Sequence, residues 1–277
     1  MYSDADRAKI VHAEAKRLEQ FLRALSPEDW QRPSACDRWQ VADVVAHLTG
    51  MALAERITRG LQGDLTPPGD SPPTGTLHED AFRENVAQRA IALRERVGPQ
   101  LLSAFIASND ALDQVLSSLR PQDWDTLCHH PMGPEPVRTW TDMRITELAM
   151  HGWDIRSRFD PQAALSADSL PALCITMPRA VRRAFRLTAS RRTPVHYRFA
   201  VADPALTIQD IVLSQDGGRC EPVRATPADV TFRCTAETYV MVMFGRVTVE
   251  AALRDRRLAY DGPPELVTAF EQAFVGG

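Results

Sequence analysis

Apolar residues in the first 160 positions recur at the spacing of a helix face. The apolar stripes cover residues 4–25, 41–59, 79–119 and 140–159. Spacings of three, four and seven place their apolar side chains on one side of a helix. Gly98 and Pro99 interrupt the third stripe, so a bend is expected there. Four amphipathic helices of this kind predict a four-helix bundle.

Two irregular stretches separate these helices. Residues 64–75 (DLTPPGDSPPTG) contain four prolines and cannot hold a helix, so we expect a mobile surface loop and a candidate active-site lid. Residues 128–137 (CHHPMGPEPV) carry His129 and His130. The favoured expectation is that these two histidines face solvent, and the alternative is that they line the mouth of a site.

The pattern changes after residue 165. Alternating apolar and polar positions predict strands over residues 195–203, 206–214, 228–234 and 256–262. Helical patterns cover residues 168–187, 237–244, 248–254 and 264–275. The predicted fold class is therefore α+β and mainly helical, with a helical bundle over residues 1–163 and a small α+β domain over residues 164–277.

Composition narrows the class of protein. The formal net charge of −4 argues against a general affinity for nucleic acid or anionic membranes. We expect no membrane span, because no apolar run approaches the required length of roughly 18 residues. The five cysteines are odd in number and widely spaced, which predicts reduced thiols in a cytoplasmic protein. Lysine occurs only at Lys9 and Lys16, which hints at an actinobacterial source. Either a monomer or a homodimer fits.

Three residues form the candidate metal site. Glu147 and His151 are four residues apart, so a helix places them on one face, one turn apart. His47 lies on the apolar stripe of a separate helix. Two imidazoles and one carboxylate can bind a divalent metal and leave positions open for water or substrate. The competing interpretation is a core histidine at position 47, a solvated Glu147 bonded to Arg144, and a His151 that caps the helix.

The surrounding residues favour ligation. An ionised carboxylate turned towards a core is costly unless a cation or several donors compensate it, and Glu147 lies on such a stripe. Asp154 is close enough to accept a hydrogen bond from the other ring nitrogen of His151, although a role at the helix end is an equal alternative. A short echo, LSPEDW (25–30) and LRPQDW (119–124), precedes a tryptophan and a ligand-bearing helix each time.

The motifs around these residues resemble one family. The run W-x-x-P-S-x-C-x-x-W-x-V-x-D-V-V-x-H-L (30–48) resembles the first signature of the mycothiol-dependent maleylpyruvate isomerase family, of the DinB/YfiT-like four-helix-bundle superfamily. The run R-I-T-E-L-A-M-H-G-W-D-I (144–155) resembles its second signature. The resemblance implies that His47, Glu147 and His151 bind a divalent metal, usually zinc.

The last hundred residues resemble the family's sterol-carrier-like C-terminal domain more loosely. An arginine of that domain contributes to activity in the isomerase, and Arg246 is its implied counterpart here. Neither the loop 64–75 nor the His129–His130 pair matches a feature of the isomerase. The resemblance therefore does not imply that this protein acts on the isomerase's substrate.

The resemblance implies a divalent-metal- and thiol-dependent transferase or isomerase. Its partners would be a small electrophilic metabolite and a low-molecular-weight thiol, mycothiol or another, which acts as a metal-bound thiolate. Transfer of the thiol is favoured slightly over isomerisation. Two other hypotheses stay open. One is a non-catalytic protein that binds small molecules or lipids, or regulates, with a structural metal site. The other is a metal hydrolase that needs no thiol.

Overall fold

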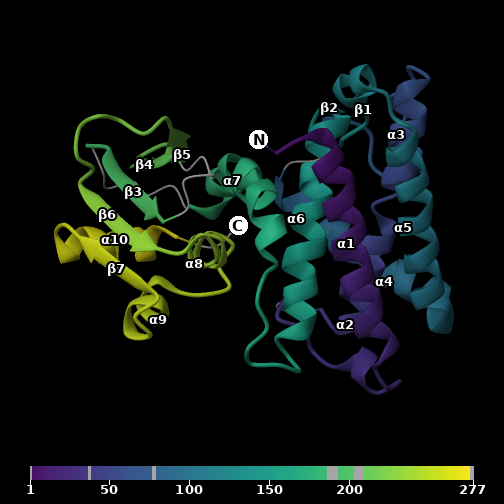
Figure 1. Ribbon diagram of the computed structural model, residues 1–277, viewed down its shortest axis with the longest axis horizontal. Coiled ribbons are helices and arrows are strands. Elements are labelled where there is room, and N and C mark those ends of the chain that lie inside the picture. Colours follow the sequence, from purple (N-terminus) through teal and green to yellow (C-terminus); the bar gives the residue numbers. More distant parts are fainter. Residues whose placement is uncertain (1, 37–38, 77–78, 186–192, 203–208, 275–277) are drawn as a thin grey trace. The chain divides into compact units, whose positions relative to one another are not determined.

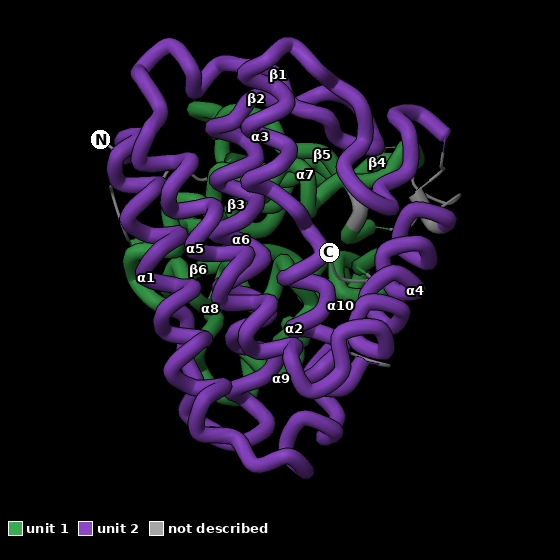
Figure 2. Tube along the Cα trace, turned by 90° about the vertical axis from the view of Figure 1, so that its right-hand side faces the viewer, with its two compact units in different colours: residues 1, 166–277 green, residues 2–165 purple. Residues whose placement is uncertain are grey.

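The chain divides into two compact units, each described here by itself. The computed structural model describes residues 2–36, 39–76, 79–185, 193–202 and 209–274. One unit covers residues 2–165 and the other residues 166–277, coloured purple and green in Figure 2. Within the described parts of the chain, no helix has both the length and the apolar content of a membrane span.

The unit 2–165 is a helical bundle (Figure 1). Its helices are α1 (Asp4–Arg23), α2 (Val41–Gly50), α3 (Leu53–Leu61), α4 (Glu79–Val97), α5 (Leu101–Ser118) and α6 (Val137–Arg156). Helix α1 packs on α5 and α6, and α2 packs on α4, α5 and α6. Val45, Phe105 and Ile145 are among the fully buried apolar residues between them. The predicted bundle is confirmed.

Two of the predicted helices are each broken in two. The helix predicted over residues 79–119 ends at Val97, because Gly98 takes a left-handed φ of 55° and Pro99 has no N–H to continue the ladder. The helix predicted over residues 41–59 was wrong as one piece: α2 ends at Gly50 and α3 begins at Leu53. Between them Ala52 has a φ of 50°, which its helix-favouring side chain does not announce.

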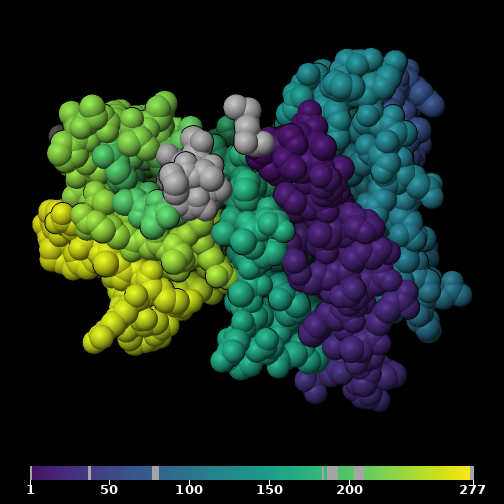
Figure 3. Space-filling view, viewed as in Figure 1, coloured from purple at the N-terminus to yellow at the C-terminus, as the bar shows by residue number. Residues whose placement is uncertain are grey.

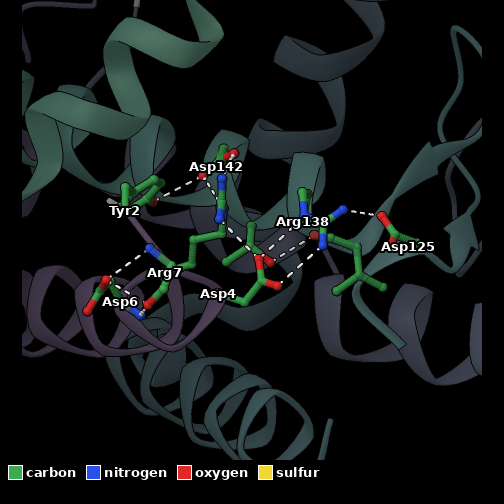
Figure 4. Close-up of polar contacts among 10 residues, drawn as sticks. Tyr2, Asp4, Asp6, Arg7, Asp125, Arg138 and Asp142 are labelled. Carbon is green, nitrogen blue, oxygen red and sulfur yellow. Dashed lines mark hydrogen bonds and ion pairs between the residues drawn. The ribbon is translucent and has the colours of Figure 1, made fainter. Parts of the chain in front are cut away.

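A buried ion pair joins the two ends of the bundle's sequence (Figure 4). Arg7 on α1 donates to both carboxylate oxygens of Asp142 on α6, at 2.8 and 3.1 Å, and the Tyr2 hydroxyl donates to the same carboxylate at 3.0 Å. Arg138 bridges Asp4 and Asp125 beside them. In Figure 3 the purple side chains of α1 lie against those of α6. These contacts fix α6, which carries two of the three candidate ligands.

The loop 64–75 is hydrogen-bonded to the segment 128–137, and its predicted mobility and role as a lid stay predictions. The Thr74 hydroxyl donates to the His130 carbonyl at 3.0 Å, and the Gly75 N–H donates to the Pro131 carbonyl at 2.7 Å. Ser71 is buried and accepts from Arg56. The segment itself forms a small ladder of β1 (Leu127–Cys128) and β2 (Glu135–Pro136).

The unit 166–277 is a five-stranded sheet with four helices among its described residues. The strand order is β5 (Gly217–Glu221), β4 (Asp210–Ser214), β3 (Val195–Val201), β6 (Val230–Cys234) and β7 (Leu258–Asp261). Of the strand pairs between described residues, β3–β6 alone is parallel. The helices are α7 (Leu170–Ala184), α8 (Ala236–Met243), α9 (Val249–Arg254) and α10 (Pro264–Ala273). The α+β prediction is confirmed.

Strand β5 was missed, because its sequence GGRCE begins with two glycines and does not alternate clearly. The predicted segments that include residues 186–187, 203, 206–208 and 275 lie partly outside the described residues.

Candidate metal centre

The three predicted ligands meet between α2 and α6. His47 comes from α2, and Glu147 and His151 come from successive turns of α6. The Oε2 atom of Glu147 lies 2.8 Å from Nε2 of His47 and 3.1 Å from Nε2 of His151. The three ligand atoms all lie within 4.8 Å of one another. The sequence prediction that the fold brings His47 to the α6 pair is therefore met by the geometry.

The donor set suits a divalent cation. Four-coordinate zinc, bound at about 2.0–2.1 Å, places neighbouring ligand atoms roughly 3.3 Å apart. The distances of 2.8 and 3.1 Å are somewhat shorter, so a small rotation of the side chains would open the site. Nε2 of His151 faces the Glu147 oxygen, and Nδ1 faces an oxygen of Asp154. A neutral imidazole carries a proton on only one of these nitrogens, so the other nitrogen would face a carboxylate oxygen with no hydrogen between them. A cation or a proton has to lie between them.

Charges at the site reflect this need. Burial alone would raise the pKa of Glu147, but hydrogen bonds from His151 and His47 hold that pKa well below its ordinary value. Burial would lower the pKa of His151, yet the neighbouring Cys36, Asp154 and Glu147 raise it well above its ordinary value. Burial lowers the pKa of His47. The ionised form of Glu147 is therefore favoured, as binding of a cation requires.

Asp154 orients His151 from behind. It is fully buried, and its Oδ2 atom lies 3.0 Å from Nδ1 of His151. This contact favours the tautomer that carries its proton on Nδ1 and leaves Nε2 free to bind a cation. The Cys36 thiol donates to the same oxygen at 2.9 Å, and its sulfur lies 3.3 Å from Nδ1. Cys36 was not predicted as part of the site, although it lies within the motif at residues 30–48.

Trp39 forms an aromatic wall beside the two histidines. Its ring centroid lies 5.2 Å from that of His47 and 6.1 Å from that of His151. The two imidazoles contact each other edge to face at 5.0 Å. An apolar wall lowers the local dielectric and strengthens the electrostatic interactions of the site. This residue too was not predicted as part of the site.

His129 and His130 form a second cluster, and the expectation that they face solvent was wrong. They are 2% and 6% exposed. The Arg56 guanidinium donates to Nδ1 of His129 at 2.6 Å and lies over the Trp140 ring, 5.0 Å from its centroid. The His130 ring contacts Trp140 at 5.0 Å. Among the described residues, this cluster is not one of the groups that could hold a metal.

Arg246 lies in the other unit, just after α8. Its N–H donates to the Met241 carbonyl at 2.9 Å and its Nη1 to the Phe244 carbonyl at 2.7 Å, so it closes the C-terminal end of that helix. Gly245 provides the left-handed turn there, with a φ of 70°. The role of Arg246 in activity stays a prediction.

The class of protein is defined by two features. One is a helical bundle in which two histidines and a glutamate form a candidate metal site, and the other is a small α+β unit that follows it in the chain. Residues 11–156 match the family model described as the mycothiol maleylpyruvate isomerase N-terminal domain. That match covers more than half of the chain, which therefore belongs to this family. Residues 187–275 match the SCP-2 sterol transfer family.

Two solved structures share the fold. The crystal structure of the mycothiol-dependent maleylpyruvate isomerase aligns with a TM-score of 0.58 at 15% identity, over 88% of this chain and 90% of the other. A histidine-to-alanine mutant of that isomerase aligns with a TM-score of 0.60 at 13% identity, over 94% and 93%. At these identities the similarity concerns the fold alone. No curated protein matches the sequence significantly.

Proposed function

We propose that the protein is a divalent-metal-dependent enzyme that uses a low-molecular-weight thiol, mycothiol in the first instance, on a small electrophilic metabolite. The observation that carries the proposal is the convergence of Nε2 of His47, Oε2 of Glu147 and Nε2 of His151 within 4.8 Å. Membership of the isomerase family supports the thiol. Two imidazoles and one carboxylate with an open position are a ligand set of catalytic zinc sites, so zinc is the ion we propose.

A bound divalent ion would favour the thiolate form of a thiol and so make it nucleophilic at neutral pH. The protein's own residues set the conditions for this. Asp154 holds His151 in one orientation, and Glu147 supplies the negative charge that attracts the cation. Trp39 shields the two imidazoles on one side. Thiolate addition followed by rotation and elimination isomerises a double bond, whereas a persistent adduct is S-transfer.

A lipid-binding function is less well supported. The interior of the unit 166–277 is filled by mutually contacting rings of Phe199, Phe232, Tyr239 and Phe270. Each of them is at most 2% exposed. Among these four rings there is no room for a lipid chain, which favours the enzyme over a lipid carrier.

The first experiment is metal analysis of the purified protein beside His47→Ala and Glu147→Ala. We expect about one divalent ion per wild-type chain and its loss in both variants, because two ligands cannot hold it. His129→Ala is the matched control, since it removes a buried histidine from the other cluster and should keep the metal. Full metal content in both ligand variants would contradict the site.

The second experiment tests the thiol. Metal-loaded protein is given maleylpyruvate or a reactive alkyl halide, with and without mycothiol. Isomerisation leaves the thiol unconsumed, whereas S-transfer consumes one thiol for each product molecule, so thiol titration separates the two reactions. Turnover that is equal without any thiol would contradict thiol dependence and favour a metal hydrolase.

A further inference from the structure

A pocket lies where α2 ends and α3 begins. It has a volume of about 270 Å³, and its lining comes from the end of α2, the start of α3, the middle of α5 and Arg144 of α6. A water molecule takes about 30 Å³ of liquid, so the pocket has room for a small organic molecule. Most of its lining is apolar, including Leu48, Leu53 and Leu112. His47, Glu147 and His151 are not among the lining residues.

The guanidinium of Arg144 is the buried cation of this pocket. The residue is 2% exposed. Its Nη1 donates to the Leu48 carbonyl at 2.8 Å and to the Met51 sulfur at 3.1 Å, and its Nη2 donates to the Asn109 side chain at 2.9 Å. All three acceptors are uncharged. The Nε–H is buried and has no hydrogen-bond partner.

No described carboxylate forms an ion pair with Arg144. Burial lowers its pKa to about 10, so it is still a cation at neutral pH. Glu147 attracts it at longer range but is hydrogen-bonded to the two histidines. Glu55 also lines the pocket, yet it is exposed and pairs with Arg59 at 2.6 Å. The carbonyl end of α2 supplies about half a negative charge, which does not neutralise a whole guanidinium.

We propose that this pocket binds a small monocarboxylate, whose carboxylate meets Arg144 and whose apolar body lies against Leu48, Leu53 and Leu112. A buried, unpaired cation is costly, and an anionic ligand removes that cost. A single guanidinium with apolar surroundings suits one carboxylate better than a phosphate, which carries more charge and needs more donors. The proposal is independent of the thiol chemistry and of the metal centre.

The test is calorimetric titration of the full-length protein with butyrate and with butyramide, which has the same shape without the charge. We expect saturable butyrate binding and affinity for butyramide at least about tenfold weaker, since hydrogen bonds to charged groups are the stronger ones. The titration is repeated after the metal is removed with a chelator. Binding that persists belongs to the pocket, and binding that disappears with the metal overturns the proposal.

Two substitutions on the same helix sharpen the test. Ala111→Phe places a ring in the pocket from an exposed position, so it should abolish butyrate binding without disturbing the core. Ala107→Phe is the matched control, because Ala107 is exposed on α5 and does not line the pocket. Arg144→Met should also abolish binding if it folds. Equal binding of butyrate and butyramide, no saturable binding, or unchanged binding in Ala111→Phe would each overturn the proposal.

Discussion

Two histidine clusters occupy the same helical unit, and they differ in the charged residue at their centre. His47 and His151 face the carboxylate of Glu147. His129 accepts a hydrogen bond from the guanidinium of Arg56, with His130 nearby across Trp140. Each cluster thus holds two histidines and a tryptophan. The number of histidines therefore does not distinguish the two clusters, whereas the sign of the central charge does, and only the cluster with the carboxylate is a candidate metal site.

The central charge also decides what the imidazole nitrogens can do. A guanidinium only donates, so Nδ1 of His129 has to accept and the ring has to be neutral there. Glu147 only accepts when ionised, so both facing nitrogens need a proton or a metal ion between them and the carboxylate. The cluster of His47 and His151 needs a proton or a metal ion beside Glu147, whereas the cluster of His129 and His130 already contains the guanidinium of Arg56.

The largest effect that separates the clusters should come from Arg56→Met. Removal of the guanidinium leaves His129, Ser71 and the Met51 carbonyl without their buried donor. We therefore expect the free energy of unfolding to fall by about 2–4 kcal/mol. Denaturant unfolding measures it. Arg59→Met, which removes a partly exposed arginine on the same helix, should cost less than about 1 kcal/mol. Loss of metal from folded Arg56→Met protein would break the comparison.

A smaller effect is expected from Asp154→Asn. The variant keeps the shape of the side chain but removes the charge that orients His151, so metal affinity should fall about 10–100-fold. Competition with a chromogenic chelator measures the affinity. His129→Gln, a substitution in the other cluster, should leave it unchanged. If both variants bind metal as the wild type does, Asp154 does not support the site.

The smallest effect is a difference in pH dependence. Burial, with the nearby Arg56, lowers the pKa of His129, so the unfolded chain takes up its proton first and stability is lost as pH falls below about 6.5. His151 has a raised pKa in the metal-free protein, so its contribution is complete below about pH 6.5 and is lost as pH rises through the raised value.

Unfolding of metal-free wild type, His129→Gln and His151→Gln between about pH 5 and 8 measures these contributions. The two differences from wild type should change in opposite directions with pH, by at most about 1.4 kcal/mol per pH unit. Slopes of the same sign would show that the two clusters do not differ in the way proposed.

Periodicity in the sequence predicted the bundle and the pairing of Glu147 with His151, whereas the family resemblance favoured His47 as the third candidate ligand. Apolar stripes define the helices, and the spacing of Glu147 and His151 follows from the helical repeat. The burial of His129 could not be read in this way. It accompanies hydrogen bonds from Thr74 and Gly75 to the carbonyls of His130 and Pro131, which are remote in sequence and lie in segments with no repeat.

Contacts through single atoms were equally hidden. Cys36 reaches Asp154 across 118 positions, which no local pattern records. The break at Ala52 follows Gly50, a weak helix former, but Met51, Ala52 and Leu53 all favour a helix, so propensity alone does not predict a left-handed residue at position 52. Among the described strands, β5 pairs with β4 alone, and its two leading glycines are not typical of a strand.

The left-handed residue Ala52 links a backbone torsion to the solvation of a charge. In a continuous helix the Leu48 carbonyl would accept from the Ala52 N–H, but here it accepts from Arg144. A side chain in this conformation costs about 1–2 kcal/mol, which glycine would not incur. A substitution at position 52 that made α2 and α3 one continuous helix would return the Leu48 carbonyl to the helical hydrogen bond. The Arg144 guanidinium would then compete for one of its acceptors.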